Sequence, residues 1–69
     1  MWLDINPRSS TPIYQQLVDG VKELVARGIL EPGERMPTVR EMAAELSLNP
    51  NTIAKAYQRL EQEGIIETM

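Results

Sequence analysis

Polar side chains of complementary chemistry recur along one face of the segment from residue 50 to residue 63. At 100° per residue, a helix over this segment gathers its apolar residues on one side. The opposite side and its flanks then carry amides, a hydroxyl and two cations, namely Asn51, Thr52, Lys55, Gln58, Arg59 and Gln62. Amides and hydroxyls can hydrogen-bond to the edges of nucleic-acid bases, and Lys and Arg can bind phosphates. This face is therefore a candidate surface for binding DNA.

The charge of this segment differs from the charge of the whole chain. The chain has seven basic and ten acidic residues and a net charge of −3, whereas a nucleic-acid-binding domain is usually basic. Between Leu46 and Leu60, however, there is no acidic residue, and Lys55 and Arg59 make the segment basic. Arg40 can add a third cation near the same edge. Because screening limits attraction to a Debye length of about 8–10 Å, the local charge decides whether phosphates are attracted.

The composition excludes most other kinds of chemistry. The 69 residues contain no Cys and no His, which excludes disulfides, thiol nucleophiles, Cys/His zinc sites and the usual neutral-pH general base. No Gly-rich phosphate loop is present, so we expect no enzyme activity, no cofactor and no metal site. Apolar runs are too short to span a membrane, and residues 1–5 do not resemble a signal peptide. We therefore expect a small cytoplasmic binding module.

The first predicted helix covers residues 12–28. Thr11 offers a capping hydroxyl, Pro12 suits the first helical position, and Gly28 suits the end. Gly20 lies inside this helix and weakens it by about 1 kcal/mol relative to Ala. We therefore expect that close packing requires a glycine there.

Two further helices are predicted over residues 39–46 and 50–63. Thr38-Val39-Arg40-Glu41 matches the capping-box pattern, and Asn49-Pro50 supplies a cap followed by proline at the first helical position. A short turn at Ser47 joins the two helices, as in a helix-turn-helix, whose second helix can enter the major groove of DNA. The predicted core consists of Leu17, Val21, Leu24, Met42, Ala43, Leu46, Ile53, Tyr57 and Leu60.

The last residues are typical of a β-strand. Ile65-Ile66-Glu67-Thr68 follows the helix stop at Gly64 and is rich in β-branched side chains. No partner strand follows before Met69, so we expect a cut chain. Because an open strand edge recruits other chains, residues 67–69 are predicted to fray or to pair with a neighbouring molecule.

From the residues alone, two functions remain open. A three-helix module could use its outer face to bind DNA or to bind a partner protein. Lys55 and Arg59 could simply be solvated, and Thr38 and Asn49 could serve only as caps. The combination of turn spacing, paired caps and an acid-free face favours DNA.

Three stretches of the sequence resemble the GntR family of bacterial transcription regulators. Residues 32–43, Pro-Gly-Glu-Arg-Met-Pro-Thr-Val-Arg-Glu-Met-Ala, are similar to the family signature P-G-x-x-L-P-S-x-R-x-L-A. Residues 49–66 are similar to T-V-x-x-A-Y-x-x-L-x-x-x-G-L-I, and residues 11–17 to P-I-Y-x-Q-I of the YtrA-like branch. The resemblance implies a mostly α, three-helix winged helix-turn-helix over residues 1–69. This would be the N-terminal DNA-binding domain of a repressor, truncated at the wing.

The resemblance also implies particular contacts and partners. Six residues match DNA-contacting or outward-facing positions of the family: Thr38, Arg40, Asn49, Asn51, Thr52 and Lys55. Arg59 lies on the same outer face and completes the predicted DNA-binding set. Double-stranded operator DNA would be the partner, and the full-length protein would be a homodimer with a wing hairpin and a C-terminal effector-binding domain. Nothing in these residues identifies the effector, and no membrane partner is implied.

Three positions depart from the family pattern. Many members have Arg where this chain has Pro50 and Ala54, so two common base or phosphate contacts are missing here. The turn residue Ser47 stands where the family often has Gly. If its φ is positive, we expect Ser47 to cost about 1 kcal/mol relative to Gly.

Overall fold

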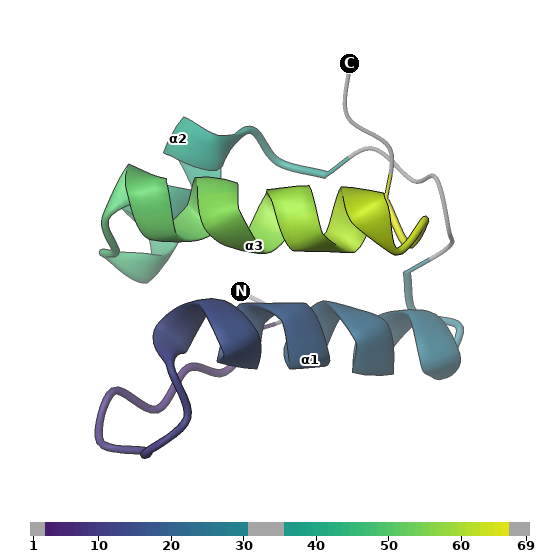
Figure 1. Ribbon diagram of the computed structural model, residues 1–69, viewed down its shortest axis with the longest axis horizontal. Helices are drawn as coiled ribbons and strands as arrows, with labels where there is room; N and C mark the ends of the chain where they lie inside the picture. Colours follow the sequence, from purple (N-terminus) through teal and green to yellow (C-terminus); the bar gives the residue numbers. More distant parts are fainter. Residues whose placement is uncertain (1–2, 31–35, 67–69) are drawn as a thin grey trace.

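The structure, a computed structural model, describes residues 3–30 and 36–66, and these residues contain three helices. They are α1 (Ile13–Ala26), α2 (Val39–Leu46) and α3 (Pro50–Gln62), which confirms the predicted order. α1 and α3 lie side by side and run in the same direction, while α2 crosses on the other side of α3 (Figure 1). Both α1 and α2 pack against α3, so α3 is the helix that holds the domain together.

The start of α1 differs from the prediction. Pro12 precedes the helix with a ψ of 147° and makes no side-chain cap, so the prediction of Thr11 as cap and Pro12 as first helical residue was wrong. The extended backbone of Pro12 places Thr11 outside the helix, where its carbonyl accepts a hydrogen bond from Gln16 Nε2 at 2.9 Å. The other end agrees, because Gly28 follows α1 with a φ of 75°.

The caps of α2 and α3 are those that the sequence predicts. Thr38 Oγ1 accepts the backbone N–H of Glu41 at 3.1 Å, and the Glu41 carboxylate accepts the N–H of Thr38 at 2.9 Å. At α3, Asn49 Oδ1 accepts the N–H of Asn51 at 2.8 Å, and Pro50 occupies the first position. Ser47 ends α2 in the left-handed region with a φ of 56°, so the strain anticipated for a non-glycine residue is present.

The core joins all three helices to the segments around them. Seven of the predicted core residues are buried, whereas Leu24 and Leu46 are only partly buried because they lie near the C-terminal ends of their helices. Segments outside the helices complete the core, and its buried members are Leu3, Leu17, Val18, Val21, Leu30, Met36, Met42, Ala43, Ile53, Ala56, Tyr57, Leu60 and Ile66.

Close packing explains the glycine inside α1. A Cβ on Gly20 would lie 2.8 Å from Leu3 Cδ2, because the N-terminal segment crosses the helix there. The same segment is fastened by Gln16, whose side chain accepts the N–H of Asn6 and donates to the carbonyls of Asn6 and Thr11. The close packing predicted for Gly20 is therefore confirmed.

The strand predicted after α3 is not formed in the described residues. Ile65 and Ile66 follow Gly64, which has a φ of 72°, and Ile66 is buried in the core. A strand requires a hydrogen-bonded partner strand, and residues 3–30 and 36–66 offer none. The predictions for residues 67–69 lie outside the described residues.

Candidate nucleic-acid interface

The helix α3 separates apolar from polar side chains as its sequence predicts. Ile53, Ala56, Tyr57 and Leu60 are buried against α1 and α2. The opposite side is solvent-exposed, and its side chains are Asn51, Lys55, Gln58, Arg59 and Gln62, with Thr52 half-buried beside them. A continuous row of donors and acceptors thus lies along the outer side of the helix.

The hydroxyl of a buried tyrosine fixes the start of α2 relative to α3. Tyr57 is 7% exposed, and its hydroxyl donates a hydrogen bond of 2.6 Å to the carbonyl of Pro37. Burial, and to a lesser extent the negative charge of Glu41, raises the pKa of Tyr57 to about 12. Sequence reasoning placed Tyr57 in the core but did not find this bond. The signal was available, because a buried tyrosine hydroxyl usually has a hydrogen-bond partner.

Two of the predicted DNA contacts come shortly after Pro37 in the chain. Thr38 and Arg40 are both exposed at the first turn of α2. The oxygen of Thr38 is engaged in the cap, but its hydroxyl proton can still be donated to a phosphate. In the same way, Asn49 uses its side-chain oxygen as a cap, and its side-chain NH₂ group can still donate.

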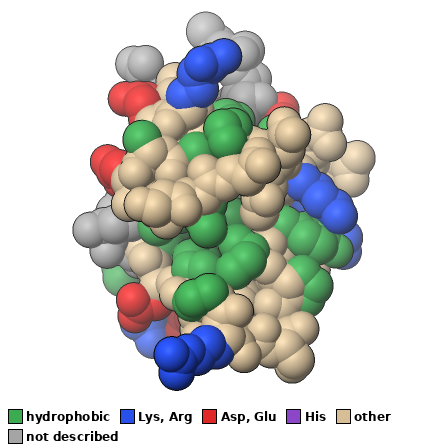
Figure 2. Space-filling model, turned by 90° about the vertical axis from the view of Figure 1, so that its left-hand side faces the viewer, with side chains coloured by type: hydrophobic (Ala, Val, Ile, Leu, Met, Phe, Trp, Pro, Cys, Tyr) green, Lys and Arg blue, Asp and Glu red, His purple; other side chains and the backbone are tan. Residues whose placement is uncertain are grey.

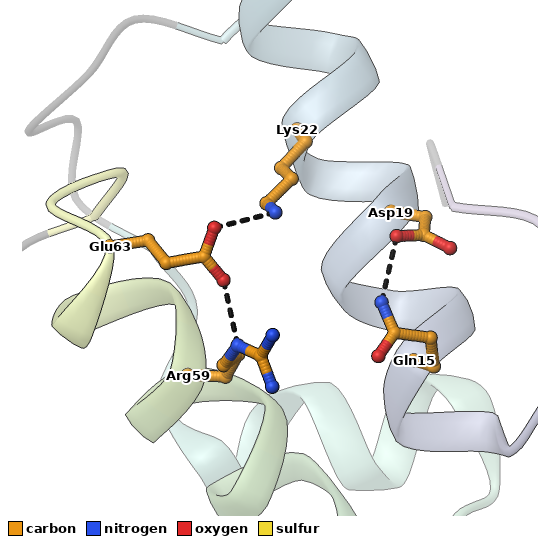
Figure 3. A network of polar contacts seen from close by, with 5 residues as sticks. All are labelled: Gln15, Asp19, Lys22, Arg59 and Glu63. Atoms are coloured by element: carbon orange, nitrogen blue, oxygen red, sulfur yellow. Dashed lines mark hydrogen bonds and ion pairs between the residues drawn. The ribbon is translucent and has the colours of Figure 1, made fainter.

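Lys55 and Arg59 are each held by a group outside the predicted set. The Lys55 ammonium lies over the ring of Tyr14 on α1, with Nζ 4.1 Å from the ring centroid. Arg59 Nε donates to Glu63 at 2.8 Å, and Lys22 of α1 pairs with the other oxygen of that carboxylate at 2.6 Å (Figure 3). These hydrogen bonds, that of Lys22 foremost, lower the pKa of Glu63.

Thr38 and Arg40 lie at the start of α2, and the other predicted residues divide into two groups. The first occupies the start of α3 and the preceding turn, and its members are Asn49, Asn51, Thr52 and Lys55. Arg59 lies farther along α3, in the ion cluster with Glu63 and Lys22, which we call the α1–α3 ion cluster. The first group shares the end of the molecule at which α1 and α3 begin (Figure 1).

This end of the molecule carries dispersed positive charge. Figure 2 shows Lys and Arg side chains around its rim, hydrophobic side chains near its middle, and most of its acidic side chains along one edge. In the described residues, no group of three potential ligands could hold a metal ion. None of the helices in those residues is long and apolar enough to cross a membrane.

The fold and the exposed polar helix are those of bacterial regulatory proteins. The family described as "Bacterial regulatory proteins, gntR family" matches residues 13–69. The chain belongs to this GntR family.

Individual relatives agree with this assignment. The HTH-type transcriptional repressor YtrA of Bacillus subtilis (strain 168) is 55% identical over 97% of this chain and 52% of that protein. The HTH-type transcriptional regulator Rv1152 of Mycobacterium tuberculosis is 42% identical over 97% of this chain and 55% of that protein. The chain spans about half the length of the curated relatives it matches.

A solved structure has the same backbone arrangement. YtrA from Sulfolobus acidocaldarius, a GntR-family transcription factor, superimposes with a TM-score of 0.93 and 42% identity, covering 100% of this chain and 73% of that chain. The three-helix arrangement is therefore that of a known GntR-family regulator.

Proposed function

We propose that this chain is the DNA-binding domain of a transcriptional repressor and that α3 reads operator DNA. The observation that carries the proposal is the exposed polar side of α3, which has no acidic residue before Glu61 and follows a tight left-handed turn at Ser47. In a helix-turn-helix, the N-terminal part of the second helix contacts base edges in the major groove. The family membership of the chain favours this function over a protein-interaction module.

The side chains suggest a division of labour in the complex. Asn51 and Thr52 lie in the first turn of α3, where amide and hydroxyl groups can reach base edges. Arg40 and Lys55 are exposed cations suited to phosphates, and Thr38 can donate a hydrogen bond to a phosphate at the start of α2. The side-chain amide of Asn49 and the guanidinium of Arg59 complete the proposed contacts.

The test compares single alanine variants on an operator duplex and on an unrelated duplex over a range of salt concentrations. Arg40→Ala should weaken binding to both duplexes similarly and lower the salt slope by about one, as expected for a lost phosphate contact. Asn51→Ala should instead lower the preference for the operator, because a lost base contact reduces discrimination by about 1–3 kcal/mol. Thermal unfolding should change little, since both side chains are exposed.

Arg27→Ala is the matched control. Arg27 is exposed at the far end of α1 and pairs with Glu23 at 3.0 Å, so removing it takes away one cation outside the proposed interface. Unchanged affinity of all the interface variants, or an equal loss in Arg27→Ala, would refute the proposed function. If the domain is instead a protein-interaction module, it should not bind either duplex, even at low salt.

We further propose that this domain belongs to a longer, homodimeric cytoplasmic regulator with a wing and an effector-binding domain. Two linked DNA-binding domains on adjacent half-sites gain about 10²–10⁴-fold in affinity through effective concentration. The test compares the 69-residue chain with a chain extended through the following domain on the same duplex. Equal affinities at physiological salt would show that the added parts contribute nothing to binding.

A further inference from the structure

Tyr14 is an aromatic residue of α1 that has no place in the proposed interface described above. It lies in the first turn of α1, is half-buried, and packs against the core. Lys55 lies on α3, which runs alongside α1 in the same direction (Figure 1). The Lys55 ammonium is 4.1 Å from the centroid of the Tyr14 ring, well within the range of about 6 Å for a cation–π contact.

The two partners of this contact differ in mobility, and this difference decides which side chain restrains the other. The Tyr14 ring is fixed by the core on one side, so it offers a stationary π-face at the edge of α3. Lys55 is exposed, and a lysine side chain with four rotatable carbons has high conformational entropy when nothing holds it. The ring therefore restrains the lysine, and the lysine has little influence on the ring.

The direction of this restraint determines what Lys55 can reach. A helix that lies in a major groove presents the middle of its outer side to base edges and its two flanks to the phosphates of the flanking strands. The contact with Tyr14 draws the Lys55 ammonium toward α1, which is one flank of α3. An ammonium has three donors, so it can keep one side on the ring and donate to a phosphate with the other.

We propose that Tyr14 is a positioning residue that holds Lys55 as a phosphate contact on the α1 side of α3, not as a base-reading residue. This inference rests on the proposed function, because it specifies how one contact of that DNA interface is made. Restraining the side chain before DNA arrives removes part of the entropy loss on binding. Because a cation–π contact at an exposed site is weak, the expected gain is about two- to five-fold in affinity.

The test uses Tyr14→Leu and Tyr14→Phe, each in the native background and in Lys55→Ala. Lys55→Ala should weaken binding to operator and unrelated duplexes by the same factor and lower the salt slope by about one. Tyr14→Leu should weaken binding about two- to five-fold when Lys55 is present and have no effect when it is absent. Tyr14→Phe retains the ring and should bind like the native chain.

A spectroscopic measurement on the free chain tests the contact without DNA. The ring current of Tyr14 should shift the ε-methylene protons of Lys55 upfield, and this shift should persist in Tyr14→Phe and disappear in Tyr14→Leu. Lys22, which pairs with Glu63, provides an internal comparison because its ε-protons should not respond to either variant.

Several results would overturn the inference. A loss of affinity in Tyr14→Leu that persists in the Lys55→Ala background would show a purely structural role. Weaker binding of Tyr14→Phe would show that the hydroxyl contacts DNA directly, and tighter binding of Tyr14→Leu would show that the ring withholds the lysine. If Arg40→Ala and Asn51→Ala impair binding while Lys55→Ala does not, the inference fails and the proposed function stands. If no interface variant affects binding, the proposed function itself fails.

Discussion

Removing the hydroxyl of Tyr57 should loosen the connection between α2 and α3. The hydroxyl donates a bond of 2.6 Å to the carbonyl of Pro37, directly before the cap of α2, and the tyrosine itself is 7% exposed. A net intramolecular hydrogen bond stabilises a protein by about 0.5–1.5 kcal/mol, and an unpaired buried acceptor costs about 1–3 kcal/mol. Pro37 is only half-buried, so water can replace part of the bond. We therefore expect Tyr57→Phe to lower the free energy of unfolding by about 1 kcal/mol.

Thermal unfolding followed by circular dichroism measures this loss. For a domain of 60–100 residues, 1 kcal/mol corresponds to a shift in Tm of about 4–8 °C. The matched control is Tyr14→Phe, which removes the hydroxyl of the other tyrosine. That hydroxyl has no hydrogen bond to any residue that the structure describes, so Tm should change by less than about 2 °C.

Two results would refute this reasoning. An unchanged Tm in Tyr57→Phe would show that the bond to Pro37 contributes nothing to stability. Equal losses in both variants would show that any missing phenol hydroxyl has the same effect. DNA binding gives a second readout, because the bond also sets the position of Thr38 and Arg40 relative to α3. We expect Tyr57→Phe to weaken duplex binding even at temperatures where the domain is fully folded.

Three further outcomes follow from the same structure. The pKa of Tyr57 is about 12 in the folded chain and about 10 when unfolded, so the contribution of Tyr57 to the free energy of unfolding should be fully present below pH 10 and be lost as the pH rises toward 12. A pH series of unfolding curves should show a smaller loss of stability over this range in Tyr57→Phe than in the native chain. Ser47→Gly should stabilise the domain by about 1 kcal/mol, because it relieves a φ of 56°, whereas Ser47→Ala should not; a higher Tm for Ser47→Ala than for Ser47→Gly would contradict this. Leu60→Ala should cost about 2–5 kcal/mol in denaturant unfolding, since Leu60 is 0% exposed, and a loss below 1 kcal/mol would contradict its place in the core.

Local signals in the sequence were sufficient to predict the helices and most of the core. The capping box of Thr38 and Glu41 and the Asn49-Pro50 start act within a few residues, so the local pattern identifies them. The 3.6-residue periodicity likewise identified the buried side of α3. The failure at Thr11 has a local cause as well, because proline allows both the first helical position and the extended backbone that it adopts here.

The contacts that shape the polar surface could not be predicted in this way. Tyr57 bonds to Pro37, Lys55 lies over Tyr14, and Lys22 pairs with Glu63. In each case the partners are far apart in the sequence and meet only because α1 and α2 pack on α3. The residue types suggested what each side chain could do, but the packing of the helices decides which partner it has.

The α1–α3 ion cluster changes how the charge of the outer face should be understood. Glu63 lies just beyond the acid-free segment, yet it reaches back one turn to Arg59, so the positive charge of that segment is partly compensated. Lys22 restores a cation at the same place from a different helix, and the cluster as a whole keeps a positive charge of one. Arg59 bonds to Glu63 through Nε, and its two terminal nitrogens point away from that carboxylate (Figure 3). Exposed ion pairs contribute little to the stability of a protein because solvent screens them, so Arg59 can bind a phosphate as well without destabilising the domain much. A chain with a net charge of −3 can therefore still present cations along α3, because no acidic residue lies between Leu46 and Leu60 and Glu63 is already paired with Arg59 and Lys22.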